Sequence, residues 1–545
     1  MDERNRDVFN NRADLGWAKL FLEDLEMPAL LKSCGAMVLA VLVVLAGTTR
    51  IGAQIAVLPS SPVPAPSKSQ KPATTLPKSC ALPGISPQQL HEVVDASNTL
   101  QPPLAADAMI RIAAKVAAQC PALAKDLLQR AFDQADRVEP DTAYKLASGM
   151  GLSTDSRISF ADKTYSLRMD RLSLQSRAVL GMAPLDAKKA IQLFQRVHTP
   201  NPTAASCADA FAPDVAIYYD ALGKVFALLR EQKPQTDAAV QAPFLQLREV
   251  TGATTSPVQL APLAKVLDEA NLDSSDLASL LSTLAAAVES FPIDDNSFFS
   301  RSQYPAVKAK AQLVELASNK QVSAAAFAHA FHDYLDRSLN GAHCEENEPT
   351  DLKELVILYQ SFNRGPAASD QGNELLSIPT SLPSIEPHPD AGEYWQTAKG
   401  KALLMDGKHV NFDDNWRPYT DAERKTPEWQ DRVRHLLDEM DNWDASEEPD
   451  ASTYYHEREI LIYRVLADIP PGTLYDRVIS VWVKTFAESS LQWDNPTEWY
   501  IGVSDFLRYS KKNVNGPASA AAIAPLKDSS NPYLHSIGIL AEFVQ

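Results

Sequence analysis

The stretch "ALAKDLLQRAFDQADRV", residues 122–138, decides the fold class of this 545-residue chain. Its apolar residues recur every three or four positions, at Ala124, Leu127, Leu128, Ala131, Ala135 and Val138. This spacing places them on one face of a helix with about 3.6 residues per turn. The stretch therefore predicts an amphipathic helix that buries this face against another element.

The same pattern recurs along the chain. The segment 186–197, DAKKAIQLFQRV, carries a nearly identical stripe, and each of the two follows a proline, Pro121 or Pro184, that closes a short turn. A third stripe covers 277–291, after the N-cap candidates Asp273 and Ser274. A pair of antiparallel helices leaves an apolar face that only a neighbouring pair covers. We therefore predict an all-α fold of stacked antiparallel helix pairs, an α-solenoid in the tetratricopeptide-like style but too degenerate for a named consensus.

Two proline-rich breaks divide the sequence, which is long enough for two or more packing units, with either several cores or one continuous elongated core. The predicted parts are an N-terminal extension with a signal peptide or single transmembrane helix (1–53), a linker (54–84), a first helical-repeat domain (85–363), a second linker (364–391) and a second, Trp-rich helical domain (392–545). In the second domain, Thr420 with Glu423 forms a capping box, and Pro427 after Thr426 marks a helix start.

The N-terminal segment contains an uninterrupted run of apolar and small residues at 33–49. These 17 residues are short for a membrane-spanning helix, which needs about 20, and cleavage after Ala53 fits a signal peptide. The acidic residues before Met27 do not suit the first region of a signal peptide, so we prefer a translation start at Met27. The alternative is that the segment is kept as an uncleaved membrane anchor. Both interpretations predict an exported body, periplasmic or extracellular, either soluble or tethered by one helix, with no other contact to the membrane.

Export changes the interpretation of the cysteines. Four follow the leader, Cys80, Cys120, Cys207 and Cys344, an even number in an oxidising compartment. Proximity along the chain favours Cys80 with Cys120 and, by default, Cys207 with Cys344. Three pairings are open on the sequence alone, and buried free thiols are the alternative.

Charge and motifs exclude several classes of function. A formal net charge of −18 without a basic stripe argues against nucleic acid as a partner. The chain has no phosphate-binding loop, no Gly-x-Gly-x-x-Gly, no Gly-x-Ser-x-Gly and no His-Glu-x-x-His. We accordingly assign no catalytic residue and no cofactor, and we leave open whether the protein is an enzyme, because catalytic groups also converge from distant positions.

The histidines gather at one place. His329 and His332 lie one turn apart, and His343 follows close behind, a set that is able to hold zinc or copper. We prefer the alternative, in which the two histidines flank a core face formed by Ala324, Ala328, Phe331 and Leu335.

Seven of the eight tryptophans lie between Trp395 and Trp499, in a region rich in acids. Aromatic side chains beside carboxylates are typical of sugar-binding grooves, although Trp is also a core residue. We expect Trp416, Trp443 and Trp493, next to Asp or Asn, to be the exposed contact residues. Glu488-Ser489 resembles the opening of lytic transglycosylases, but the family's further elements are missing and Glu289-Ser290 repeats the dipeptide.

The segments DRLSLQSRAVLGMAPLDAKKAIQLFQRV (170–197) and ILIYRVLADIPPGTLYDRVISVWVKTFAESSLQWDN (460–495), with the exported leader, resemble uncharacterised secreted helical-repeat proteins of acidobacteria. The resemblance implies a fold and a location, and it carries no functional residues. From architecture we predict a protein-binding or scaffolding module of the cell envelope that engages an envelope protein or an extended polymer. The alternative is a carbohydrate-binding or carbohydrate-active protein that uses the Trp-rich domain.

Overall fold

A computed structural model describes residues 80–138, 168–202, 214–231, 237–295, 303–339, 343–344, 385–386, 398–447, 472–489 and 523–544, apart from isolated positions. Single positions between 454 and 470 and between 503 and 507 are also described. The predicted leader at 33–49, Ala53 and most of both predicted linkers lie outside the described residues. No helix in the described ranges has both the length and the hydrophobicity needed to cross a bilayer.

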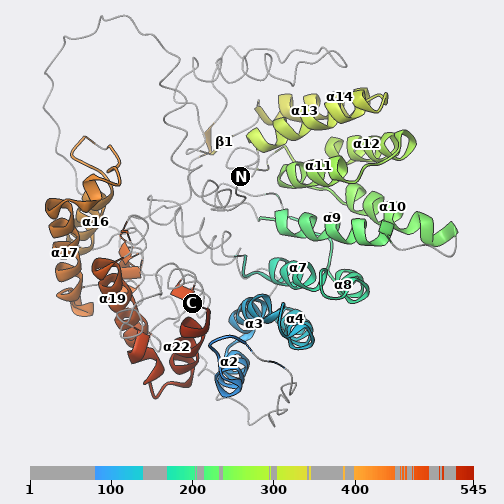
Figure 1. Cartoon of the computed structure of the whole chain (residues 1–545). Coiled ribbons are helices and arrows are strands. Elements are labelled where there is room, and N and C mark those ends of the chain that lie inside the picture. The colour runs from blue at the N-terminus through green and yellow to red at the C-terminus, as the bar shows by residue number, and fades with distance from the viewer. Residues whose placement is uncertain are drawn as a thin grey trace, which may run out of the picture. The chain divides into compact units, whose positions relative to one another are not determined.

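The described part of the chain is all-α (Figure 1). Its first eleven α-helices are α2 (Pro87–Thr99), α3 (Pro102–Val116), α4 (Pro121–Ala135), α7 (Arg171–Met182), α8 (Ala187–Phe194), α9 (Ala216–Glu231), α10 (Asp237–Gly252), α11 (Leu260–Glu269), α12 (Ser274–Glu289), α13 (Gln303–Asn319) and α14 (Ala325–Leu339). The predicted helix pairs correspond to α3 with α4 and α7 with α8.

These helices pack in a repeating order. α3, α7, α9, α11 and α13 contact one another in sequence and form what we call the first row. α12 lies between α10 and α14 in the same manner, so these three helices form part of a second row. Contact between alternate helices is the expected result when each pair buries its apolar face against the next pair.

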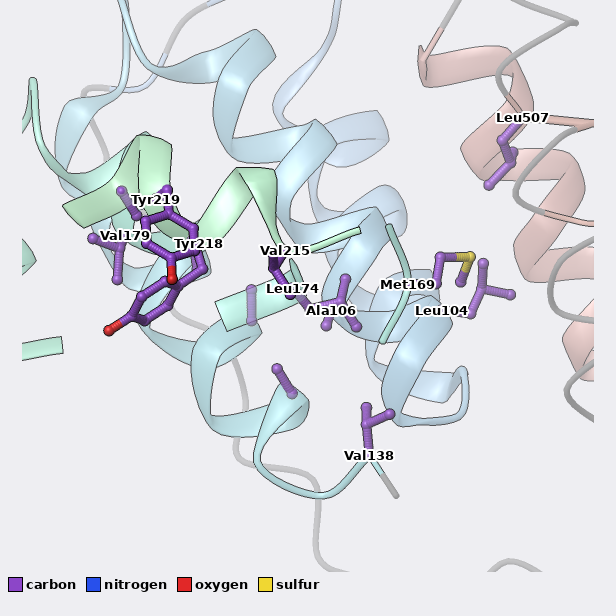
Figure 2. Packing of buried hydrophobic residues seen from close by; sticks show 14 of the residues in the cluster. Leu104, Ala106, Val138, Met169, Leu174, Val179, Val215, Tyr218, Tyr219 and Leu507 are labelled. Atoms are coloured by element: carbon purple, nitrogen blue, oxygen red, sulfur yellow. The ribbon is translucent and has the colours of Figure 1, made fainter. Parts of the chain in front are cut away.

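The three stripes that predicted the fold are buried, apart from the half-buried Ala187 of the second stripe. Leu127 and Ala131 of α4 are fully inaccessible, as are Leu277 and Leu284 of α12. Figure 2 shows part of this core, to which α3, α7 and α9 contribute Leu104, Leu174 and Tyr219 among others. The helical period of the sequence therefore identified the core-facing side of these helices correctly.

The helix starts also follow the predicted chemistry. Asp273 is the N-cap of α12, and its carboxylate accepts a hydrogen bond of 2.8 Å from the Asp276 N–H. Thr426 caps α17 (Pro427–Asp441), whose first residue is the predicted proline. These side chains satisfy backbone N–H groups that have no partner within the helix.

The C-terminal part contains α16 (Ala398–Asn411), α17, α19 (Thr473–Ser489) and α22 (Pro532–Val544), with short 3₁₀ turns η6 (Glu423–Lys425) and η7 (Ala445–Glu447); a further 3₁₀ turn, η2 (Pro257–Gln259), precedes α11. α17 packs against both α16 and α19. α22 belongs to the predicted second domain, yet it packs on α2 and α3 of the predicted first domain. The Thr99 and Ser536 hydroxyl oxygens lie 2.6 Å apart at this contact.

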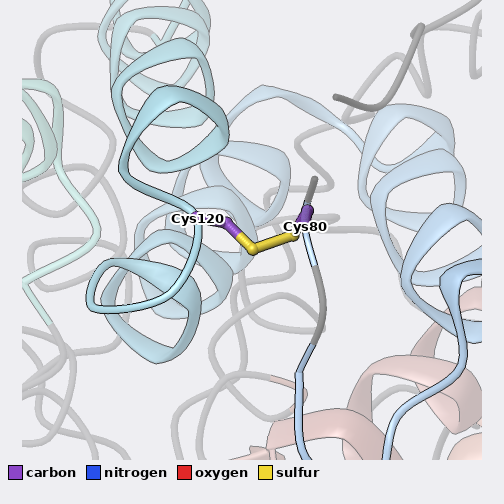
Figure 3. The surroundings of a disulfide bond; sticks show 2 residues. All are labelled: Cys80 and Cys120. Carbon is purple, nitrogen blue, oxygen red and sulfur yellow. A yellow bond between two sulfur atoms is a disulfide. The ribbon is translucent and has the colours of Figure 1, made fainter. Parts of the chain in front are cut away.

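Cys80 and Cys120 form a disulfide with a Cα–Cα distance of 5.2 Å (Figure 3). The pairing favoured by proximity is therefore confirmed for these two residues. The bond ties the end of the predicted linker to the turn between α3 and α4. Gly84 nearby has a φ of +76°, a left-handed conformation that glycine adopts without strain. The Cys207 side chain and the Cys344 side chain lie outside the described residues, so their pairing stays a prediction.

Two short strands were not predicted. β1 (His343–Cys344) pairs in parallel with β2 (Ile385–Glu386). Each strand has two residues, which is too short to produce an alternating pattern in the sequence.

Candidate functional site

A groove of about 590 Å³ crosses three consecutive helices of the first row, α7, α9 and α11. We call it the α9–α11 groove. Apolar side chains line it, including Leu180, Phe226 and Val266. Five charged residues line it as well: Asp220, Lys224, Arg230, Lys265 and Glu269. A pocket of this size with an apolar lining and a few charged groups is suited to holding part of a ligand.

Two contacts hold the walls of the groove together. The Lys265 ammonium on α11 donates a hydrogen bond of 2.8 Å to the Asp220 carboxylate on α9. This hydrogen bond raises the pKa of Lys265, and burial opposes the shift. Arg230 on α9 donates to the Ala270 carbonyl and, at 3.4 Å, to the Asn271 carbonyl, both just after α11. A cation near the C-terminus of a helix is favourable because it satisfies unpaired carbonyl groups.

The other two charges of the groove are not compensated in this way. Lys224 on α9 is exposed and forms no ion pair or side-chain hydrogen bond with the residues that the structure describes. Glu269 on α11 is likewise exposed and makes no such contact within the described ranges, and its charge acts at longer range on Lys265, whose pKa it helps to raise. The groove therefore presents a positive charge on its α9 wall and a negative charge on its α11 wall.

The histidines chosen from the sequence share one carboxylate. His329 Nε2 lies 3.5 Å from Asp333 Oδ2, and His332 Nδ1 lies 3.7 Å from Asp333 Oδ1. The His343 side chain lies outside the described residues. Among the described residues, no three His, Cys, Asp or Glu side chains come together as a metal site would require. The preferred alternative is confirmed for the core face, whose four residues are buried, but the ring nitrogens of His332 are buried too and do not face solvent as that alternative predicted.

The prediction that Trp443 is exposed is wrong, because its side chain is only 2% accessible. Its ring packs edge-to-face with Tyr454 at 5.1 Å, and the Tyr454 hydroxyl donates to the Trp443 carbonyl at 2.8 Å. The polar neighbours of Trp443 in sequence are exposed while the indole fills the space after α17. Trp416 and Trp493 lie outside the described residues.

The remaining described tryptophans of this region are core residues. Trp482 is fully buried and stacks on Phe486 at 5.7 Å. Trp429 is 2% accessible, and its indole N–H donates to the Val410 carbonyl at 2.8 Å. For these residues, the interpretation of Trp as a packing residue is correct.

Glu488 lies at the exposed end of α19, near two tyrosines that the sequence did not single out. Burial raises the pKa of Tyr455, and the charge of Glu488 adds to this shift. Burial and the charge of Glu488 also raise the pKa of Tyr454. The charge of Glu488 therefore acts on two tyrosines, and Glu289 lies at the exposed end of α12.

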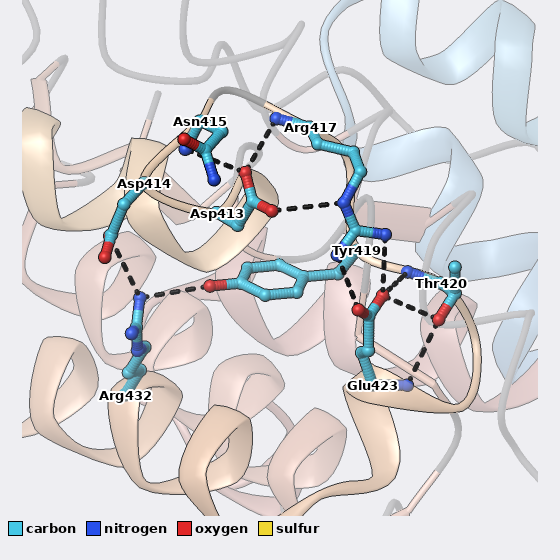
Figure 4. A network of polar contacts seen from close by, with 8 residues as sticks. All are labelled: Asp413, Asp414, Asn415, Arg417, Tyr419, Thr420, Glu423 and Arg432. Atoms are coloured by element: carbon cyan, nitrogen blue, oxygen red, sulfur yellow. Dashed lines mark hydrogen bonds and ion pairs between the residues drawn. The ribbon is translucent and has the colours of Figure 1, made fainter.

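The loop between α16 and α17 carries a dense polar network (Figure 4). Asp413 accepts hydrogen bonds of 2.9 Å from the backbone N–H groups of Asn415 and Arg417. Glu423 accepts from the Arg417 guanidinium at 2.6 Å and from the Thr420 N–H at 2.7 Å. The Glu423 N–H returns a hydrogen bond to the Thr420 hydroxyl, so the reciprocal hydrogen bonds of the predicted capping box are present, but the following turn η6 begins at Glu423 with Ala422 as its N-cap.

The hydrogen bonds of this network also affect titration. They lower the pKa of Glu423 to about 2, chiefly through Arg417. Tyr419 accepts a hydrogen bond of 3.0 Å from Arg432 at the other side of the loop. The acidic and basic side chains of this loop pair with one another. We infer that the network fixes the conformation of the loop that leads into α17.

The sequence pattern did not single out the charged residues of the groove. α9 and α11 each contain one lysine, Lys224 and Lys265. A lysine on the polar face of a helix is the ordinary pattern of a solvated helix face. Nothing local distinguishes them, because the groove exists only where α9 and α11 lie together. No protein-family model, curated protein or solved structure matches the chain.

Proposed function

We propose that the protein is an exported binding or scaffolding module of the cell envelope, and that the α9–α11 groove contacts its partner protein. The observation that carries this proposal is the groove itself, an apolar depression with charged side chains across three helices of one row. Helical-repeat proteins commonly use one face of stacked helices to bind a partner. An apolar centre with a polar rim is the usual composition of a protein interface.

The location is part of the proposal. An apolar leader at 33–49 with cleavage after Ala53, or retention of the leader as an anchor, supports export. The Cys80–Cys120 disulfide suits an oxidising compartment. The likeness in style to tetratricopeptide repeats belongs to the proposal too, and it rests on the contacts between alternate helices.

The test compares two matched substitutions. Ala227 is exposed and lines the groove, so Ala227→Trp fills the groove without disturbing the core. Ala286 is exposed on α12, in the second row, and Ala286→Trp serves as the control. Co-purification from the native envelope after chemical crosslinking is expected to recover a partner with the wild type and with Ala286→Trp, and to lose it with Ala227→Trp. Equal recovery with both variants contradicts the proposal.

The second candidate is a carbohydrate-binding or carbohydrate-active role for the Trp-rich region, with an extended polymer as the ligand. Its support is the exposed Glu488 carboxylate near Tyr454 and Tyr455, since carboxylates and aromatic rings together bind sugars, but the two rings are only 3% and 8% accessible. The burial of Trp443 counts against an exposed stacking platform. Binding of envelope glycans that Glu488→Gln weakens favours this candidate, whereas tryptophan fluorescence unchanged by those glycans argues against it.

A further inference from the structure

The charges of the α9–α11 groove fall into two groups. Asp220 and Lys265 neutralise each other at 2.8 Å, and Arg230 is held by carbonyl groups at the end of α11. Lys224 and Glu269 form no hydrogen bond or ion pair with the described residues, although the charge of Glu269 helps to raise the pKa of Lys265. A ligand that enters the groove therefore meets the exposed ammonium group of Lys224 on α9 and the exposed carboxylate of Glu269 on α11, both of which are open to form ion pairs with it.

The lining between these charges is apolar. Phe226 is 5% accessible and lies under the Arg230 guanidinium, whose centre is 5.8 Å from the ring centroid. Gly223 adds no side chain, and Val266 lies opposite it, 3.6 Å from the position of a Cβ at Gly223. Since a Cβ at Gly223 would already touch Val266, the space for an apolar side chain of a ligand is the open volume of the groove, about 590 Å³.

We propose that the groove binds a peptide segment with an apolar anchor residue, a carboxylate on the side facing α9 and a cationic side chain on the side facing α11. This inference rests on the proposed function and specifies the chemistry of the partner. The carboxylate pairs with Lys224, and the cation pairs with Glu269. A polyanion is disfavoured by Asp220 and Glu269, and a neutral glycan leaves both charges without a partner.

The probes are four short synthetic peptides with a central tryptophan. One carries Asp before and Lys after the anchor, and the others replace Asp by Asn, Lys by Gln, or both. An exposed ion pair contributes only a modest binding free energy. We therefore expect each replacement to weaken binding of the peptide to the wild-type full chain by about two- to fivefold. Fluorescence anisotropy of labelled peptides measures these differences.

Matched variants of the protein assign each charge to its partner. With Lys224→Gln, the Asp-to-Asn difference is expected to vanish while the Lys-to-Gln difference persists; Glu269→Gln is expected to do the opposite. Lys188→Gln on α8 and Glu289→Gln on α12 remove exposed charges outside the groove and are expected to leave both differences intact.

Two results separate this inference from the proposed function. If all four peptides bind equally or none binds, or if the differences survive in the groove variants, the inference is wrong, although loss of the native partner with Ala227→Trp still supports the proposed function. If Ala227→Trp leaves the partner bound, the proposed function and the inference both fail.

Discussion

Single charged residues in the core show most directly how this chain departs from a simple amphipathic pattern. Asp107 on α3 is fully buried and accepts hydrogen bonds from Arg111 at 2.7 Å and Arg177 at 2.5 Å. Arg177 belongs to α7, so this ion triad joins two helices of the first row. Burial alone raises the pKa of Asp107, but the two guanidinium groups outweigh it and lower the pKa from 3.8 to about 2.

Asp107 makes stability depend on pH. Because the pKa of Asp107 is lower in the folded state than in the unfolded state, its carboxylate stabilises the fold. This contribution to the unfolding free energy is fully present above about pH 4 and is lost as the pH falls through about 2. We expect Asp107→Asn to lower the unfolding free energy by about 3 kcal/mol at neutral pH, with the difference from wild type shrinking in this acidic range. Urea unfolding at several pH values measures it. Asp126→Asn, which removes an exposed partner of Arg130, is the control and is expected to have little effect.

Arg458 has a comparable role in the C-terminal part. Its side chain is 1% accessible and donates hydrogen bonds to the Met440 carbonyl at 2.8 Å and the Thr485 hydroxyl at 2.9 Å. It therefore connects the end of α17 to α19. We expect Arg458→Met to cost about 3–5 kcal/mol, because the acceptors lose their donor inside the protein.

Arg458→Lys separates charge from geometry at this position. An ammonium group keeps the charge but lacks the planar fork that reaches both helices, so we expect an intermediate loss of stability. Thermal unfolding of both variants measures the effect. Equal stability of wild type and Arg458→Met shows that the position tolerates an apolar residue and contradicts the assigned role.

At the level of elements, the caps of the helices agree with their sequence signals. Asp273 shows this for α12, because its carboxylate accepts from both the Asp276 N–H at 2.8 Å and the Ser275 hydroxyl at 2.9 Å. These hydrogen bonds lower the pKa of Asp273, with the Asp276 N–H as the largest cause. The cap and the apolar stripe together specify where α12 begins and which side it buries.

Removing this cap provides a prediction for a whole element. We expect Asp273→Ala to destabilise the protein by about 1 kcal/mol and to increase hydrogen exchange in the first turn of α12. Ser282→Ala on the exposed side of α12 is the matched control. Increased exchange throughout α12 and α14 instead of the first turn contradicts a purely local cap effect.

At the scale of the whole molecule, contacts between distant parts of the sequence matter most. The Cys80–Cys120 disulfide encloses α2 and α3, and α22 packs on the same two helices. The N-terminal helices are thus held by a covalent bond and by the C-terminal helix.

Loss of the disulfide tests this arrangement. We expect the Cys80→Ser, Cys120→Ser double variant to lower the unfolding free energy by about 2–4 kcal/mol, since a closed loop restricts the unfolded chain. Hydrogen exchange is expected to rise first in α2, which lies inside the loop. Chemical reduction of the Cys80–Cys120 disulfide in the wild type should produce the same loss of stability. Unchanged hydrogen exchange in α2 of the double variant contradicts this prediction.

Local patterns account for much of what was predicted correctly. The stripes of α4, α8, α12 and α14 and the caps of α12 and α17 depend on residues within a few positions of one another. The charged stretch at 457–459 shows the limit of such patterns. Glu457, Arg458 and Glu459 are three consecutive charged residues, yet all three are at most 1% accessible. Arg458 is hydrogen-bonded to α17 and α19, and the local sequence does not reveal these partners.

The amino-acid sequence by itself determined that the protein is all-α, which faces of several helices are buried and where several of them begin. These properties follow from side-chain periodicity and from hydrogen bonds to neighbouring backbone groups. Only the tertiary structure decided that Trp443 is buried, that α22 packs on α2, and that Lys224 and Glu269 line one groove. The physical reason is that each of these depends on which helices come into contact, and such contacts join residues far apart in the chain.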